Sequence, residues 1–349
     1  MMFPTKVNKP FWTAICLIII GVMLFSGCSI GEKKLPSDEA NYSIRVGLIT
    51  SQEGVDDPAY QMAWEGLQKA EQELNAGIQF VAAQNEKDYP KQLADLKSKG
   101  CQVIFTIGNS ATAAVLEAAK SNPKIKYICL DSSIDGQLPE NVLAVTYRTE
   151  EAAFLAGYIA AKTTTSHVVG YIAGDNQLTS KPLYYGFRAG VRFVHPNCEI
   201  LKGVAATYTN KNRVEEMTGA MLESQADVVF HTAGMAGKGM IEAMKDAGKY
   251  AIGSDVDQND VAPETVLTSV IKENGQVAYD IIKQIEDNTL VFGKSVSYGL
   301  AENGVSLAEK TNTMLPEDTY NQLMAYQQKI IDGKITVPSN ENGKLVVTN

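Results

Sequence analysis

Short apolar runs alternate with longer amphipathic stretches along most of the chain, which is the pattern of alternating strands and helices. The first apolar run, at residues 44–49, is followed by a polar loop and by Pro58. From Tyr60 onward, apolar residues recur at helical spacing. We therefore predict a strand, a loop and a helix that starts near Pro58 and covers one face of a sheet.

The first half of the chain continues this alternation. We predict strands at residues 78–82, 103–107 and 127–130, and helices at 89–98 and 111–119. These strands are apolar on both faces, which is typical of a parallel sheet covered by helices. The first half therefore forms one complete α/β unit, here called the first lobe.

The second half repeats the series after a helix predicted at residues 149–161. We predict strands at 168–172, 200–205, 228–230 and 250–252, and helices at 182–194, 214–224 and 239–246. Two α/β units of similar size predict two facing Rossmann-like lobes with loops at the carboxyl ends of the strands.

The chain length of 349 residues suits two domains of ordinary size. We assign the first lobe to residues 43–148, completed by about 274–310, and the second lobe to 149–272. A C-terminal helix and polar tail occupy 311–349. The chain would then pass between the lobes more than once, which predicts a hinge made of several strands rather than a loose linker.

The N-terminus has the features of a secretory leader. Lys6 and Lys9 precede an apolar run at residues 11–25, and small residues follow it. That run is shorter than the roughly 20 residues of a membrane-spanning helix. Residues 1–27 therefore form a signal peptide, and Ser26 and Gly27 before Cys28 resemble a bacterial lipobox, although Phe25 stands where leucine is usual.

Acylation of Cys28 would make it the first mature residue and hold the protein on the outer face of the cell membrane by lipid, with residues 28–42 as a flexible tether. The net charge is −9. It falls to −11 without the leader, because the leader carries two lysines and no acid. No basic run precedes the first strand, which argues against nucleic acid as a partner.

The residues offer little support for catalysis, a metal or a cofactor. The sequence has no GxSxG elbow between a predicted strand and a predicted helix, no HExxH and no GxxxxGK[ST], and its three histidines share no spacing with cysteine or acid. Cys101, Cys129 and Cys198 lack CxxC spacing and suit small buried positions. Asp56 and Asp57 alone provide too few oxygens for calcium. We therefore expect no enzyme, no metal and no cofactor.

Polar residues gather at the predicted carboxyl ends of strands, where open α/β sheets bind ligands. The candidate ligand-binding residues are Ser51, Gln52, Asp57, Tyr60, Asn109, Asp131, Gly234, Asp255 and Lys272. A single acid at a strand end can be a helix cap or an ion-pair partner, and Tyr60 can simply pack. Their recurrence at the same end of successive strands favours a small polar ligand held between the lobes.

Several segments resemble the basic membrane protein family of lipoproteins, which includes purine nucleoside receptors of ABC importers. The matching segments are 56–67 (DDPAYQMAWEGL), 150–161 (EEAAFLAGYIAA), 186–191 (GFRAGV), 252–258 (IGSDVDQ) and 267–272 (LTSVIK). They run in order from the lipobox to about residue 280. The resemblance implies the type I periplasmic binding protein fold.

The resemblance also implies roles for individual residues. Tyr60 takes the place of a phenylalanine that stacks on the base, and Asp131 that of a carboxylate that contacts the base. Asp255 and Lys272 correspond to the residues that hold the ribose hydroxyls. Ser51 and Gln52 stand where many purine nucleoside binders have an acid and an amide, and no motif gives a second aromatic wall.

We therefore predict a monomeric, lipid-anchored solute-binding protein that captures a nucleoside, preferably a purine nucleoside, by hinge closure. It would present this ligand to an ABC permease and its ATPase. Alternatives are a ligand sensor of the same fold that acts in signalling or regulation, and a binder of a different small solute. A nucleoside hydrolase would need an acidic calcium cluster, for which the sequence offers too few residues.

Overall fold

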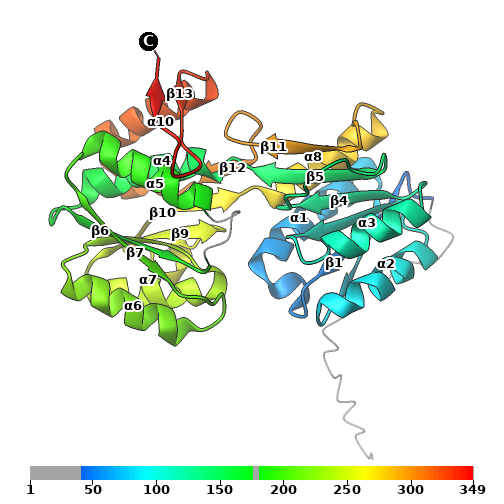
Figure 1. The fold of residues 1–349 in the computed structure, drawn as a ribbon, viewed down its shortest axis with the longest axis horizontal. Helices are drawn as coiled ribbons and strands as arrows, with labels where there is room; N and C mark the ends of the chain where they lie inside the picture. Colours follow the sequence, from blue (N-terminus) through cyan, green and yellow to red (C-terminus); the bar gives the residue numbers. More distant parts are fainter. Residues whose placement is uncertain (1–40, 176–180, 349) are drawn as a thin grey trace, which may run out of the picture. The chain divides into compact units, whose positions relative to one another are not determined.

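A computed structural model describes residues 41–175 and 181–348, which form two six-stranded sheets with helices packed on them (Figure 1). The predicted signal peptide, Cys28 and most of the tether lie outside the described residues. Among the described residues, none of the helices combines the length and the apolar character that crossing a bilayer demands.

The first sheet contains only parallel strand pairs. Its strands, in order across the sheet, are β11 (Lys294–Tyr298), β5 (Val142–Tyr147), β4 (Lys126–Leu130), β3 (Val103–Ile107), β1 (Arg45–Thr50) and β2 (Gly77–Ala82). The five residues of β3 are all buried, which explains its unbroken apolar sequence. The predicted parallel sheet of the first lobe is therefore present.

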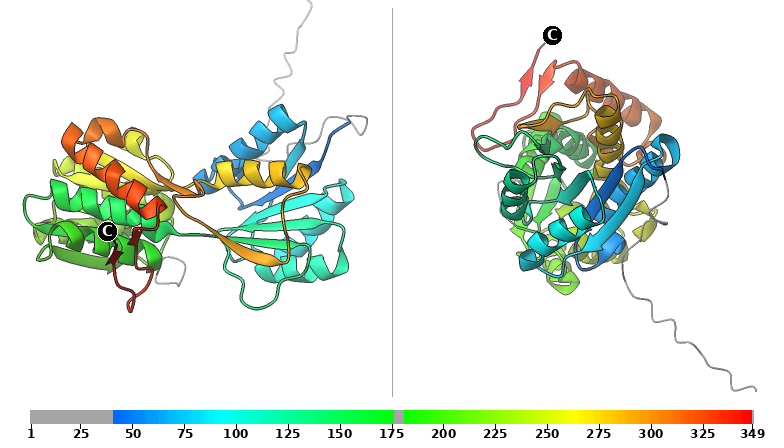
Figure 2. Two further views of the ribbon diagram at one scale, coloured as in Figure 1. Left: turned by 90° about the horizontal axis from the view of Figure 1, so that it is seen from above. Right: turned by 90° about the vertical axis from the view of Figure 1, so that its right-hand side faces the viewer.

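Helices cover both faces of this sheet. They are α1 (Pro58–Leu74), α2 (Tyr89–Ser98), α3 (Thr112–Ser121) and α8 (Asn274–Glu286), with short 3₁₀ turns at Gly54–Asp56 and Glu86–Asp88. Helix α8 lies beside α1 (Figure 2). The two helices approach so closely that a Cβ on Gly66 would lie 2.0 Å from the carbonyl oxygen of Gly275. A segment from late in the chain thus completes the first lobe.

The second sheet has one antiparallel strand at its edge. Its order is β12 (Val305–Leu307), β10 (Val266–Lys272), β9 (Tyr250–Asp255), β8 (Val228–Thr232), β6 (Val168–Ala173) and β7 (Glu199–Val204). Strand β12 pairs antiparallel with β10, in the register Val270 to Leu307. The other pairs are parallel.

Two helices of the second lobe, α4 and α5, also pack closely against each other. Its helices are α4 (Thr149–Thr163), α5 (Lys181–Val194), α6 (Lys211–Glu223), α7 (Lys238–Asp246), α9 (Thr311–Met314) and α10 (Glu317–Ile331), with 3₁₀ turns η3 (Gly234–Gly237) and η4 (Asn259–Val261); a small hairpin of β13 (Ile335–Thr336) and β14 (Val346–Val347) follows α10. A Cβ on Gly157 of α4 would lie 2.1 Å from the carbonyl oxygen of Phe187 on α5. Glycine therefore lets these two helices touch through their backbones.

The segment expected to complete the first lobe, residues 274–310, is divided between the lobes. Helix α8 packs on α1, and β11 pairs with β5 of the first sheet. Strand β12 instead pairs with β10 of the second sheet. The chain therefore crosses between the sheets after β5, after β10 and between β11 and β12, which gives the predicted hinge of several segments.

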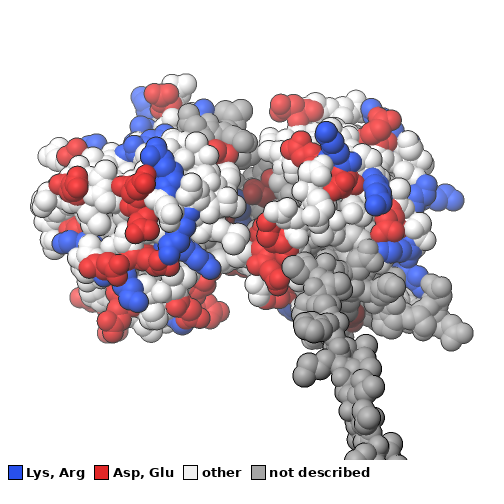
Figure 3. Space-filling view, turned by 90° about the horizontal axis from the view of Figure 1, so that it is seen from below, with Lys and Arg blue, Asp and Glu red and all other residues white. Residues whose placement is uncertain are grey.

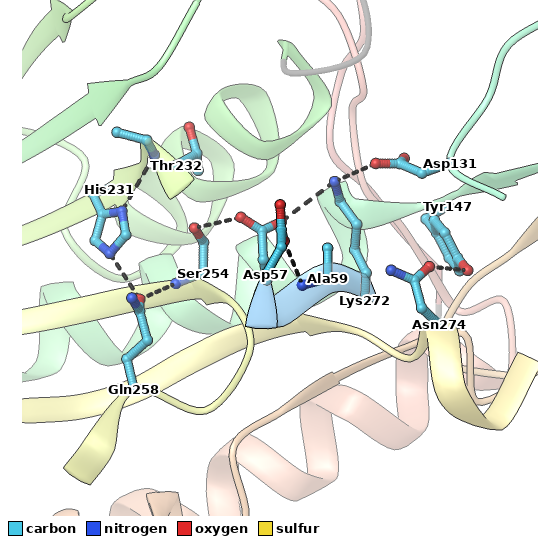
Figure 4. Close-up of polar contacts among 12 residues, drawn as sticks. Asp57, Ala59, Asp131, Tyr147, His231, Thr232, Ser254, Gln258, Lys272 and Asn274 are labelled. Carbon is cyan, nitrogen blue, oxygen red and sulfur yellow. Dashed lines mark hydrogen bonds and ion pairs between the residues drawn. The ribbon is translucent and has the colours of Figure 1, made fainter. Parts of the chain in front are cut away.

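Polar contacts bind these crossing segments to one another. The guanidinium of Arg148 donates to Glu151 at 2.6 Å, to the carbonyl oxygen of Ser297 at 2.8 Å, and to Glu302. The buried Tyr147 hydroxyl donates to Asn274 Oδ1 at 2.7 Å (Figure 4). The hinge is therefore an ordered structure with its own hydrogen bonds.

Cys101, Cys129 and Cys198 are free thiols and buried, as the sequence predicts. Burial raises the pKa of Cys101 and of Cys129 to about 11. On the face shown in Figure 3, acidic and basic side chains of the described residues are interspersed rather than gathered by sign.

Candidate functional site

Three of the predicted site residues meet at the carboxyl ends of β4, β9 and β10. The ammonium Nζ of Lys272 lies 2.7 Å from Asp131 Oδ2 and 3.4 Å from Asp255 Oδ1. Figure 4 shows Lys272 reaching from the end of β10 toward Asp131. Because Asp131 follows a strand of the first sheet, while the other two residues end strands of the second, this charged trio joins the two lobes.

Both aspartates of the trio have a left-handed backbone. The φ angle is +48° at Asp131 and +70° at Asp255. This conformation costs a residue other than glycine roughly 1–2 kcal/mol. Such strain is concentrated at functional sites, where the surrounding structure holds it in place.

The trio is partly shielded from water and carries a net negative charge. The exposed fractions of the side chains are 18% for Lys272, 28% for Asp131 and 33% for Asp255. Burial lowers the pKa of Lys272, but the two carboxylates more than offset this, so its pKa is raised above the ordinary value. The ammonium can donate to the hydroxyl groups of a neutral ligand, and the two carboxylates can accept from them.

Asp57 has two contacts at the start of α1. Its Oδ1 accepts from the backbone N–H of Ala59 at 3.0 Å, and its Oδ2 accepts from the Ser51 hydroxyl at 3.4 Å. It is therefore the N-cap of α1, which was the simpler of the two interpretations of its sequence position. Burial raises the pKa of Asp57, and repulsion from Glu53 and Asp255 adds to this, so Asp57 lies within the electrostatic field of the trio.

Tyr60 is largely packed into its own lobe. Its exposed fraction is 9%, and it belongs to the same buried cluster as Trp64. Burial raises the pKa of its hydroxyl, as do the neighbouring Tyr89 and Asp57. The ring therefore lies next to the loop that carries Asp57, with a small part of its surface exposed.

Gln52 and Asn109 have hydrogen bonds that do not reach the trio. Gln52 is exposed and donates to Glu53 at 2.7 Å. Asn109 Oδ1 accepts from the Ser132 hydroxyl at 3.1 Å and from the Ser133 backbone N–H at 3.0 Å. Asn109 thus fastens the loop that directly follows Asp131.

Tyr208 is an aromatic residue near the trio that the sequence analysis missed. Its exposed fraction is 46%. A Cβ on Gly174 would lie 2.4 Å from its ring, and one on Gly234 would lie 3.3 Å away. Burial and a hydrogen bond to Asp175 raise its pKa, and the charges of Lys272 and Asp255 also act on it. Tyr208 follows β7, so the strand-end rule that selected Asp131 would have found it too.

Comparisons with known proteins agree on one family. The family model described as "Bmp: ABC transporter substrate-binding protein PnrA-like" matches residues 44–341. Basic membrane protein B of Borrelia garinii subsp. bavariensis is 31% identical over 94% of this chain and 96% of its own length. The ABC transporter nucleoside-binding protein BmpA of Lactococcus lactis subsp. cremoris is 31% identical over 93% of this chain and 97% of its own length.

A solved structure supports the fold. The crystal structure of an ABC transporter solute-binding protein from Aeropyrum pernix K1 superimposes with a TM-score of 0.73 at 22% identity. The match covers 86% of this chain and 94% of that one. At this identity the comparison concerns the fold alone.

Proposed function

Because the chain belongs to the Bmp family of PnrA-like ABC transporter substrate-binding proteins and has the type I periplasmic binding protein fold, we propose that it binds a nucleoside at the charged trio. The observation that carries this proposal is the position of Lys272 between Asp131 of one lobe and Asp255 of the other. A ligand at this point would touch both lobes at once. The nucleoside-binding relative supports the choice of ligand.

The chemistry of the site suits a neutral ligand with several hydroxyl groups. Ribose hydroxyls donate to carboxylates and accept from an ammonium, so Asp255 and Lys272 can hold the sugar. Asp131 can accept from N–H groups on the edge of the base. These charge-assisted hydrogen bonds each contribute roughly 1.5–3 kcal/mol.

Two tyrosines are available to stack on the base. Tyr60 comes from the first lobe, and Tyr208 supplies the second aromatic wall from the other. Stacking of one base on one aromatic ring contributes about 1–3 kcal/mol. We prefer a purine because its larger ring system offers more stacking area to two tyrosines.

Binding would be coupled to movement about the hinge. The three crossing segments allow the lobes to close on the ligand and exclude water. The closed, ligand-bound form would be the one that an ABC permease and its ATPase recognise, and no covalent chemistry is involved. Acylation of Cys28 would keep the protein on the outer face of the membrane.

The test is a calorimetric and thermal-shift screen of the protein without its first 28 residues. Adenosine, guanosine and inosine should raise the melting temperature, because a ligand that binds only the folded state stabilises it. Pyrimidine nucleosides, free bases, sugars and amino acids complete the panel. If another solute stabilises the protein while nucleosides do not, the proposed ligand is wrong.

One pair of variants tests the site. Asp255→Ala should weaken nucleoside binding about 10- to 150-fold, since it removes a charge-assisted hydrogen bond. Asp260→Ala is the matched control, because the Asp260 side chain is 89% exposed and pairs with Lys310 instead. Equal affinity of the two variants would refute the role of Asp255.

A further inference from the structure

His231 is a fully buried histidine at the end of β8, one residue before the strand ends. Its Nδ1 lies 3.2 Å from the backbone nitrogen of Ala233, and its Nε2 lies 2.8 Å from Gln258 Oε1. A backbone N–H can only donate, so Nδ1 accepts and the ring proton is on Nε2. Burial lowers the pKa of His231 to about 4, which keeps the ring neutral near pH 7.

Gln258 connects this histidine to the strand that carries Asp255. Its Oε1 accepts from His231 and also from the backbone N–H of Ser254 at 2.9 Å. Its own backbone N–H donates to the buried Ser269 hydroxyl at 3.1 Å. Gln258 is 7% exposed, so these hydrogen bonds are shielded from water.

This series of hydrogen bonds ends at Asp255 of the charged trio. The Ser254 hydroxyl donates to Asp255 Oδ2 at 3.1 Å, while Asp255 Oδ1 faces Lys272. Asp255 has the strained left-handed backbone described above. Its conformation therefore needs support from neighbouring residues, and the hydrogen bond from Ser254 N–H to Gln258 lies one residue away (Figure 4).

The same histidine ring supports the turn that contains Gly234. A Cβ on Gly237 would lie 1.9 Å from the His231 ring, so the backbone of η3 rests directly on the imidazole. The other end of this turn, Gly234, lies against Tyr208. The buried ring thus contacts this turn directly and is linked to the strand that carries Asp255 through Gln258.

We propose that His231 and Gln258 are positioning residues, which hold Asp255 and the turn Gly234–Gly237 in the geometry that binds ligand. This inference rests on the proposed function, because Asp255 must contact the ligand for its position to matter. Neither residue touches the ligand in this account. A purely structural pair would stabilise the lobe without affecting how strongly Asp255 contributes to binding.

A double-mutant cycle separates the two roles. Gln258→Met keeps the size of the side chain and removes the shared acceptor oxygen. We expect it to weaken nucleoside binding by the purified protein about tenfold, measured by calorimetry, and by less than about twofold when Asp255→Ala is already present. Thr311→Val is the matched control. It removes a buried hydrogen bond to Thr268 of the same sheet, and this hydrogen bond does not reach the site.

Two variants of His231 cover the case in which Gln258→Met fails to fold. His231→Gln retains an N–H group that can donate to Gln258, whereas His231→Phe does not. His231→Gln should keep most of the affinity for the nucleoside. His231→Phe should lower this affinity about tenfold when Asp255 is present, and by little when Asp255→Ala is already present.

The outcomes are distinguishable. If Asp255→Ala weakens binding and the Gln258 or His231 effects are additive with it, the positioning role is wrong while the proposed function stands. If Gln258→Met and His231→Phe bind as the unmodified protein does, the positioning role is also wrong. If Asp255→Ala leaves the affinity unchanged, the proposed function of Asp255 fails and the positioning role fails with it.

Discussion

The Nζ atom of Lys272, in the second lobe, lies 2.7 Å from Oδ2 of Asp131, in the first lobe. The same ammonium is 3.4 Å from Asp255. The contact between the lobes at this point is therefore electrostatic. A ligand that enters the site must satisfy these three charges at least as well as they satisfy one another.

Removing the cation should have two effects. Lys272→Met leaves two carboxylates close together without their counter-charge, and we expect it to lower the free energy of unfolding by about 1–3 kcal/mol and to weaken nucleoside binding about 100-fold. Urea denaturation and calorimetry measure the two effects. Lys310→Met, which breaks the exposed pair with Asp260, should leave the free energy of unfolding nearly unchanged. Unchanged affinity in Lys272→Met would remove the trio from the site.

Tyr208 should contribute through its ring. Tyr208→Ala should weaken nucleoside binding about 5- to 150-fold, which corresponds to the loss of about 1–3 kcal/mol of stacking, and Tyr208→Phe should retain most of the affinity. Tyr250→Ala is a suitable control, because Tyr250 is 40% exposed at the opposite end of the same sheet. Equal affinities for the two alanine variants would mean that Tyr208 does not contact the base.

The contact between α4 and α5 predicts a sharp difference between two glycines. Gly157→Ala would bring a methyl group within 2.1 Å of the Phe187 carbonyl oxygen, so we expect a loss of about 3 kcal/mol in the free energy of unfolding. Gly219 of α6 has no atom within 4 Å of its Cβ position among the described residues. Gly219→Ala should therefore stabilise the protein by about 0.5–1 kcal/mol. Equal effects in thermal unfolding would contradict this packing.

Glu150, in the first turn of α4, predicts a specific dependence of stability on pH. Burial raises its pKa from 4.5 to about 7, and the nearby Glu151 adds to this. The folded state therefore holds this proton more tightly than the unfolded state, and stability falls as pH rises from about 4.5 to 7. Glu150→Gln removes the effect and should stabilise the protein by up to about 3 kcal/mol at pH 8, with no gain at pH 4.

Melting temperatures at both pH values check this prediction. Glu117→Gln serves as the control, because the Glu117 side chain is 78% exposed and should change stability little at either pH. A gain in Glu150→Gln that is the same at pH 4 and pH 8 would show that the carboxyl group is not buried as described.

The sequence predicted most of the fold because parallel strands buried on both faces leave long apolar signals. Strand β3 is such a case, with all of its residues buried. Strand β12 was assigned to the wrong lobe because a strand of three residues carries no information about its partner. Its pairing depends on where the crossing segments lead the chain, which is a property of the whole fold.

The grouping of three candidate site residues was predictable for a similar reason. Asp131, Asp255 and Lys272 lie at the carboxyl ends of three strands. Strand ends can be located in the sequence, and residues at these ends lie at the same edge of an α/β sheet. The left-handed backbones of the two aspartates and the contact of Tyr208 with Gly174 depend on loop geometry, which has no periodic signal. The hydrogen bond from Gln52 to Glu53 is likewise a local contact that no periodic pattern reveals.

The three buried thiols make the described chain convenient for optical experiments on lobe closure. Burial raises the pKa of Cys101, Cys129 and Cys198, so few of these thiols are ionised at pH 8 and maleimide dyes should leave them unreacted. Cysteines introduced at Val291 of the first lobe and Tyr250 of the second, both exposed, would then carry a donor and an acceptor dye in a protein without Cys16 and Cys28. Energy transfer between these dyes would report in real time whether the lobes close when a nucleoside is added.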